Sequence, residues 1–160
     1  PNCTTKLSRV NPNSIISCLG AEEGTTQFYI NTSDSYCTGA SMYKEQTEFY
    51  EGSIGITLPV VTLDSINQQF DFIKMDVQGA ELDIIKGGLN TIKQTSVLQL
   101  ELGMLNYNEG APKASEIISY LYNLGFDLFD VGSFYYWDNK LNQSDMFFVN
   151  RKKLDIRITK

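Results

Sequence analysis

The feature that most constrains this chain is a strand, a helix and a second strand that follow one another in its centre. Residues 70–75 have the apolar character of a buried strand, and residues 80–93 repeat apolar side chains with helical spacing. Those side chains share one face of the helix: Leu82, Ile85, Leu89 and Ile92. Residues 96–102 form a second strand pattern at βαβ spacing. This alternation predicts an α/β fold, because right-handed crossovers join neighbouring parallel strands.

Patterns elsewhere in the chain extend this architecture. Segments rich in β-branched and aromatic residues predict four further strands, at residues 14–19, 25–31, 56–61 and 126–131. Pro59 favours a sheet edge for its strand, because proline lacks the N–H that a central ladder uses. A helix is predicted over residues 114–124, with Gly125 in the left-handed position that ends it. Residues 4–10 are interpreted as a helix end, and the polar residues 32–55 as a long loop.

The last part of the chain predicts an antiparallel hairpin. Asp138 and Asn139 form a polar turn between the aromatic residues 134–137 and the apolar residues 145–150. We interpret residues 134–137 as part of the core, because large aromatic side chains are usually buried. The sheet is therefore expected to be mostly parallel and to be closed by this hairpin.

Length and composition indicate one globular domain over residues 1–160. A chain of this length buries roughly 70% of its extended surface, and 42% of the residues are hydrophobic. The net charge is -6 and the basic residues are scattered, which argues against a nucleic-acid partner. No apolar run approaches the length of a membrane span, and the first residues do not resemble a signal peptide. Cys3, Cys18 and Cys37 have no metal-like spacing and are odd in number, so we expect a reducing, cytoplasmic location.

Several kinds of catalytic site are excluded by missing residues. The chain contains no histidine, which removes histidine-based triads and most zinc sites. The glycine patterns of phosphate-binding loops, dinucleotide-binding folds and serine-hydrolase elbows are also absent. A general base in this chain is therefore a carboxylate, a tyrosine, a lysine or a bound hydroxide, and no metal ligands are predicted.

Two carboxylates are predicted to meet at one edge of the sheet. Asp76 directly follows one strand, and Glu101 lies close to the end of the next. Ligands bind at the carboxyl ends of strands in open α/β sheets, so we favour a functional role for Asp76 over simple stabilisation of a helix start. Glu101 either pairs with Lys74 or faces the cleft, and we favour the cleft. For Glu81, in the first helical turn, structural and functional roles are equally favoured.

The central segment carries a family resemblance. DFIKMDVQGAELDIIKGG, residues 71–88, resembles the signature of FkbM-type methyltransferases, in which a strand ends in Lys-Ile-Asp-Val-Glu-Gly-Ala-Glu and a helix with Leu-Lys-Gly follows. The segments LGAEEGTTQFYIN, LPVVTLDSI and VLQLELG resemble neighbouring parts of the family, so the resemblance spans roughly residues 14–150. It implies a class I, Rossmann-like methyltransferase fold that uses S-adenosylmethionine, usually to methylate a hydroxyl oxygen.

The resemblance also implies roles for particular residues. The reaction would take place beside Asp76, Glu101 and Glu81, with a small molecule or a glycan as the methyl acceptor. The cofactor would lie between Asp76 on one side and Leu19 and Gly20 on the other.

Two departures from the family qualify these roles. Gln78 stands where the family usually has glutamate, which weakens any proposal of a metal at the turn. The first two strands of the family sheet and its glycine-rich cofactor loop have no counterpart, so the chain resembles roughly the last two-thirds of the enzyme. We therefore expect weak cofactor binding, no activity of this fragment alone, and open sheet edges at residues 14–19 and 70–75 that favour self-association. The alternative is a non-catalytic α/β module that binds a partner or its own copies.

Overall fold

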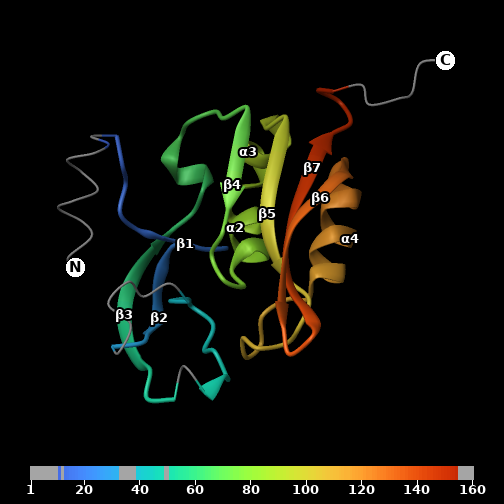
Figure 1. The fold of residues 1–160 in the computed structure, drawn as a ribbon. Coiled ribbons are helices and arrows are strands. Elements are labelled where there is room, and N and C mark those ends of the chain that lie inside the picture. Colours follow the sequence, from blue (N-terminus) through green and yellow to red (C-terminus); the bar gives the residue numbers. More distant parts are fainter. Residues whose placement is uncertain (1–10, 12, 33–38, 49–50, 155–160) are drawn as a thin grey trace.

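A computed structural model describes residue 11 and residues 13–32, 39–48 and 51–154. These residues form two β-sheets and a set of short helices (Figure 1). The helix end expected at residues 4–10 lies outside the described residues. Among the described helices, none has the length and apolar character needed to cross a membrane.

The smaller sheet has three strands in the order β1-β3-β2. They are β1 (Cys18–Leu19), β2 (Gly24–Ile30) and β3 (Ile54–Val61). The strand expected over residues 14–19 is therefore confined to its last two residues, and Ile15 and Ile16 are exposed. The ladder is this short because only Val60 and Val61 of β3 pair with β1.

The prediction that Pro59 marks a sheet edge is wrong, because β3 is the central strand of its sheet. Pro59 lies opposite Thr25 of β2, whereas β1 pairs only with Val60 and Val61. Pro59 thus lies beyond the end of β1, where its missing N–H removes no ladder bond on that side.

The larger sheet has four strands in the order β4-β5-β7-β6. They are β4 (Phe72–Met75), β5 (Val97–Gly103), β6 (Phe126–Trp137) and β7 (Lys140–Asn150). β4 and β5 are parallel, but β7 is antiparallel to both of its neighbours. The prediction of a mostly parallel sheet is therefore wrong, and both sheets are mixed. The tight turn after β6 reverses the chain and inserts β7 between β5 and β6.

The β6–β7 hairpin is confirmed, with a change in its extent. Asp138 and Asn139 both have positive φ, 47° and 57°, as a two-residue type I′ turn requires. β6 is one strand with register irregularities rather than two separate segments. The prediction that residues 134–137 belong to the core is wrong, because all four are exposed. The last pairing of β5 joins Gly103 to Gln143, so the hairpin projects beyond its neighbouring strand.

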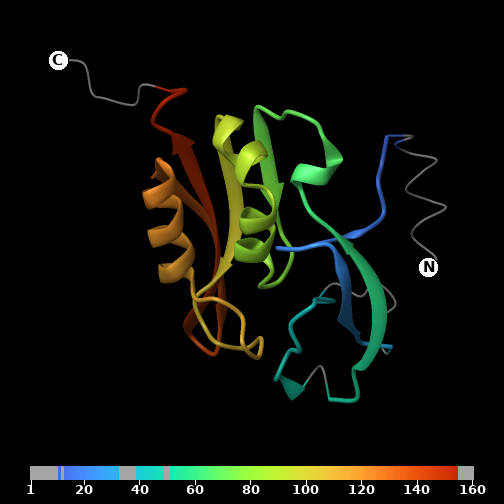
Figure 2. The same ribbon diagram turned by 180° about the vertical axis from the view of Figure 1, so that it is seen from behind.

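Three helices lie on one face of the larger sheet, as Figure 2 shows from behind. They are α2 (Glu81–Gly87), α3 (Leu89–Gln94) and α4 (Ala114–Leu124), and a short 3-10 helix, η2 (Asp64–Ile66), precedes β4. The core lies between them and the sheet, where alternate β5 residues are fully buried: Leu98, Leu100 and Leu102. The bounds predicted for α4 are confirmed, and Gly125 has the expected left-handed φ of 101°.

The helix predicted over residues 80–93 is divided at a pair of glycines. A Cβ on Gly87 would lie 2.0 Å from the carbonyl oxygen of Gly20, and a Cβ on Gly88 would lie 2.7 Å from the side chain of Leu63. The glycines therefore allow the helical segment to approach the end of β1 and the segment before η2. This close approach fixes the smaller sheet against α2.

Gly87→Ala is expected to destabilise the fold by about 1–3 kcal/mol, because the new methyl group would overlap the backbone of Gly20 and Ala21, which cannot change rotamer as a side chain can. The midpoint of urea unfolding measures this change. Gly132→Ala is the matched control, since nothing lies within 4 Å of its added Cβ. Equal midpoints for Gly87→Ala and the unmodified protein would contradict the close approach.

β1 and β4 are each at one end of their sheets, and β2 and β6 are at the other ends. Among the described residues, β1 and β4 therefore each have one edge without a neighbouring strand, where open edges were expected. By contrast, β3 and β5 have a neighbouring strand on each side.

Candidate functional site

The predicted site residues gather around the turn from β4 into α2. Gln78 and Gly79 both lie in the left-handed region, with φ of 55° and 107°. This conformation is uncommon for glutamine and strained for residues other than glycine. A Cβ on Gly79 would also lie 2.9 Å from that of Ala111. The turn thus requires glycine at position 79. The backbone conformation of Gln78 also limits the directions that its side chain can take.

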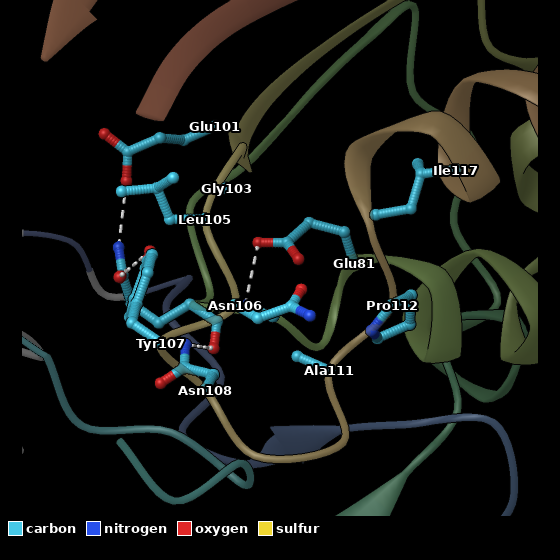
Figure 3. A pocket seen from close by; sticks show the side chains of 12 residues that line it. Glu81, Glu101, Gly103, Leu105, Asn106, Tyr107, Asn108, Ala111, Pro112 and Ile117 are labelled. Carbon is cyan, nitrogen blue, oxygen red and sulfur yellow. Dashed lines mark hydrogen bonds between the residues drawn. The ribbon is translucent and has the colours of Figure 1, made fainter. Parts of the chain in front are cut away.

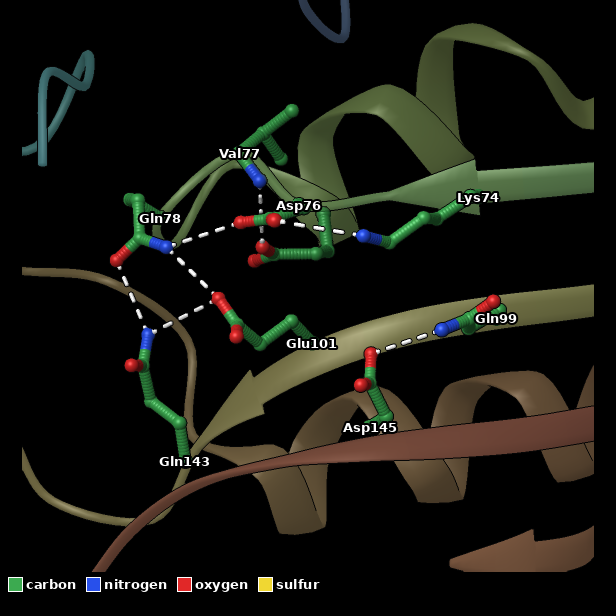
Figure 4. Close-up of polar contacts among 9 residues, drawn as sticks. Lys74, Asp76, Val77, Gln78, Gln99, Glu101, Gln143 and Asp145 are labelled. Atoms are coloured by element: carbon green, nitrogen blue, oxygen red, sulfur yellow. Dashed lines mark hydrogen bonds and ion pairs between the residues drawn. The ribbon is translucent and has the colours of Figure 1, made fainter. Parts of the chain in front are cut away.

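The side-chain amide of Gln78 joins the two predicted carboxylates (Figure 4). Its Nε2 donates to Asp76 Oδ1 at 3.0 Å and to Glu101 Oε2 at 2.8 Å. Asp76 follows the end of β4 and Glu101 comes from the neighbouring β5, so the two acids meet at the Gln78 amide, and we call this place the crevice.

Lys74 pairs with Asp76 rather than with Glu101. Its Nζ lies 3.6 Å from Asp76 Oδ2, and both side chains remain about half exposed. An ion pair this exposed contributes little to stability. Glu101 instead accepts hydrogen bonds from Gln78 and Gln143 and lines a small cavity.

The pKa of Glu101 is raised by its surroundings. Burial raises its pKa, and hydrogen bonding and charge repulsion from Asp76 raise it further, to about 7. The hydrogen bond from Gln78 acts in the opposite direction. A pKa close to the working pH is suited to general acid–base chemistry.

Glu81 lies at the start of α2 and is almost completely buried, with 2% of its surface exposed. Its Oε1 accepts the backbone N–H groups of Val77 and Gly79, each at 3.4 Å. Burial raises the pKa of Glu81, although these N–H groups partly offset that effect. Its contacts stabilise the turn that carries Gln78.

Two polar residues that sequence reasoning missed complete the network. Gln143 Nε2 donates to Gln78 Oε1 at 3.0 Å and to Tyr107 Oη at 2.6 Å, and lies 3.3 Å from Glu101 Oε2. Gln143 is 65 residues from Gln78 in the chain. The insertion of β7 beside β5 brings them together, and no local pattern signals that insertion.

A small cavity opens beside this network, between the β4–α2 turn and the loop from β5 to α4 (Figure 3). It has a volume of about 20 Å³ and is lined by Glu81, Glu101, Asn106, Tyr107 and Asn108, among others. Asn108 Nδ2 donates to the Gln78 carbonyl at 2.7 Å. Its Oδ1 is buried without a hydrogen-bond partner in the described part of the chain.

A larger cavity of about 270 Å³ is lined by residues of the smaller sheet, the β4–α2 turn and α2. Most of its lining is apolar: Leu19, Phe28, Ala40, Met42, Val77, Ala80 and Ile84. Two of the predicted cofactor residues, Leu19 and Asp76, line it. Gly20 follows Leu19 directly, and its carbonyl faces Gly87 of α2. Burial raises the pKa of Cys18, a further lining residue, which favours the protonated thiol.

The described part of the predicted loop at residues 32–55 packs against the site. Ser41 Oγ donates to the Gln78 carbonyl at 2.8 Å. The Gln46 N–H donates to the Tyr107 carbonyl at 2.7 Å, and the Glu109 N–H donates to the Lys44 carbonyl at 2.9 Å. These bonds attach the loop to both the turn and the β5–α4 loop.

A family model described as the methyltransferase FkbM domain matches residues 1–128. The chain belongs to this family. The match includes the β4–α2 turn, Asp76, Glu81 and Glu101, but it ends before most of the β6–β7 hairpin and Gln143. Comparison with curated proteins and with solved structures found no match. Family membership indicates methyl transfer, and methyltransferases of this kind use S-adenosylmethionine as the methyl donor.

Glu101→Gln is expected to change the pH dependence of stability. Glu101 has a pKa of about 7 in the folded FkbM domain and an ordinary value of 4.5, so the folded state holds its proton over a wider pH range. Its contribution to stability is therefore present at low pH and is lost as the pH rises through about 7. The variant should lose less stability than the unmodified protein between about pH 5 and pH 8.

Urea unfolding at several pH values measures this difference. Glu22→Gln is the control, because Glu22 is an exposed carboxylate in the turn before β2. If Glu101→Gln and Glu22→Gln followed the same pH curve as the unmodified protein, the raised pKa of Glu101 would be disproved.

Proposed function

We propose that this FkbM-family chain carries the acceptor side of an S-adenosylmethionine-dependent O-methyltransferase. The observation that supports it best is the single amide of Gln78 that holds Asp76 and Glu101 together at the ends of β4 and β5. Such strand ends are the usual ligand sites of α/β folds. The expected acceptor is a hydroxyl group of a small molecule or a glycan.

The two acids have different tasks in this proposal. S-adenosylmethionine, when bound, supplies an electrophilic methyl group, so a hydroxyl acceptor must lose its proton as its oxygen is methylated. Glu101, with a pKa of about 7, is the group that takes up this proton. Asp76 orients the acceptor, and Gln78 keeps both carboxylates in place. Glu81 acts through the turn that it stabilises rather than through contact with the acceptor.

The larger cavity fits the adenosyl part of this cofactor. Its lining is mostly apolar, as an aromatic base requires, and the Asp76 carboxylate at one side complements a positively charged sulfonium. Leu19, Gly20 and Asp76 are the residues proposed to hold it.

Asp76→Asn should lower methyl transfer by a factor of about 100–10,000, measured in a form of the protein that also contains a cofactor-binding loop. The loss is expected because the amide cannot provide the negative charge that Asp76 contributes to the crevice. Asp71→Asn is the matched control, since Asp71 precedes the same strand at its opposite end and is exposed. Equal turnover of the two variants would remove Asp76 from the mechanism.

The 160-residue chain itself should bind S-adenosylmethionine with a dissociation constant weaker than about 1 μM. No glycine-rich strand–turn–helix is present in these residues to bring backbone N–H groups to the cofactor. Isothermal titration calorimetry measures this affinity. A submicromolar constant would show that the cavity alone is sufficient, and the chain would then be expected to be active.

The second candidate function is a non-catalytic module that associates with its own copies. The observation that favours it is the pair of open edges on β1 and β4, because exposed strand edges recruit further strands. Sedimentation equilibrium distinguishes a monomer from such an assembly. The proposed cytoplasmic location rests on the sparse cysteines alone.

A further inference from the structure

We propose that the exposed aromatic end of the β6–β7 hairpin binds a neutral carbohydrate and presents one of its hydroxyl groups to the acid pair. We call Tyr135, Tyr136 and Trp137 the hairpin face. Successive side chains of a strand point to opposite faces, so Tyr135 and Trp137 lie on the side of Gln143, and Tyr136 extends the aromatic end on the other side. This inference rests on the proposed function, because it names the acceptor class of the same site.

The hairpin face is unusually exposed for aromatic residues. Tyr135, Tyr136 and Trp137 expose 49%, 67% and 51% of their surfaces. Exposed aromatic side chains that gather at one place mark interaction sites, because their rings provide apolar area and the Tyr and Trp polar groups provide hydrogen bonds. A sugar ring has both an apolar C–H face and a rim of hydroxyl groups, so it matches both properties.

The hairpin face is continuous with the catalytic crevice. Tyr135 lies directly opposite Gln143 in the β6–β7 ladder, and directly opposed side chains share a face of the sheet with Cβ atoms about 5 Å apart. Gln143 in turn lies 3.3 Å from Glu101 Oε2. Figure 1 shows the hairpin turn and the β5–α4 loop at the same edge of the sheet. Gln143 is therefore both the cross-strand neighbour of Tyr135 and a contact of Glu101.

The small cavity beside the crevice supplies an unused acceptor for a hydroxyl group. Asn108 is 7% exposed, and its Oδ1 has no hydrogen-bond partner among the described residues. The cavity of about 20 Å³ has room for one group the size of a water molecule. A buried acceptor without a donor is unfavourable, so a ligand hydroxyl that donates to Asn108 Oδ1 would be stabilised.

The negative charge of the crevice and of the whole chain favours a neutral ligand over an anionic one. Asp76 and Glu101 lie together at the crevice, and the whole chain has a net charge of -6. A phosphorylated or carboxylated acceptor would be repelled by these groups, whereas a neutral sugar would not.

The geometry of β6 argues against a peptide or a second copy at this place. Strand addition needs a regular row of backbone groups, and β6 has three register irregularities: between Leu128 and Asp130, between Gly132 and Phe134, and between Tyr135 and Tyr136. Such bulges are a common means of preventing edge pairing. The side chains of the hairpin face, rather than its backbone, are therefore the binding elements.

Trp137 is the single tryptophan of the chain, so intrinsic fluorescence reports on the hairpin face directly. Cellohexaose, chitohexaose and maltohexaose serve as neutral probes, and a galacturonic acid hexamer serves as the anionic one. At least one neutral probe should produce a saturable change of Trp137 emission, and the anionic hexamer should bind about tenfold more weakly or not at all.

Two variants locate the binding surface. Tyr135→Ala should weaken binding of the neutral probe about tenfold, because it removes the ring nearest the crevice. Phe129→Ala is the matched control, since Phe129 is also an exposed aromatic residue but lies nearer the other end of β6, and this variant should bind as the unmodified protein does. Circular dichroism of both variants verifies that the fold is retained.

The inference is overturned if none of the three neutral probes gives a saturable change, or if the two variants bind alike. It is also overturned if the change in emission follows protein concentration without sugar, which would mean that a second copy covers the hairpin face. Sugar binding without methyl transfer by a cofactor-binding form would remove the proposed function but keep this site. Methyl transfer to a non-sugar hydroxyl without sugar binding would support the proposed function and overturn this inference.

Discussion

The site depends on the amide group of Gln78, which contacts both acids at once. Its nitrogen donates to Asp76 and Glu101, while its oxygen accepts from Gln143. A glutamate, which the resemblance places at this position, would only accept when ionised and would repel both neighbours. Glutamine therefore provides a neutral donor to two carboxylates that lie close together.

The backbone of Gln78 is held as firmly as its side chain. Its carbonyl accepts hydrogen bonds from Ser41 and Asn108, which come from two different loops, and Glu81 binds the N–H groups on either side of it. These contacts offset the left-handed conformation, which a glutamine would not keep in isolation. The loops of the crevice are thus part of the same unit as the acids they surround.

Local patterns predicted the parts of the fold that local interactions determine. The bounds of α4 and the turn at Asp138 and Asn139 follow from helical spacing and from residues suited to positive φ. The position of Pro59, the break at Gly87 and Gly88 and the place of β7 depend on contacts between distant segments, and sequence reasoning missed them. The exposed aromatic residues of the hairpin were misread for the same reason, because hydrophobicity does not show where a neighbouring strand ends.

The same division holds for the site. Asp76 and Glu101 could be brought together in advance, because strand ends in an α/β sheet share one edge. Tyr107, Asn108 and Gln143 could not, since nothing near them in the sequence marks them as neighbours of Gln78.

The contact between Gly20 and Gly87 joins the segment beside the larger cavity to α2. Because the Gly20 carbonyl rests against α2, the segment that carries Leu19 cannot move closer to that helix without displacing it. α2 begins at Glu81, which holds the turn bearing Gln78. A single short helix therefore contacts the segment beside the larger cavity at one end and the turn that bears Gln78 at the other.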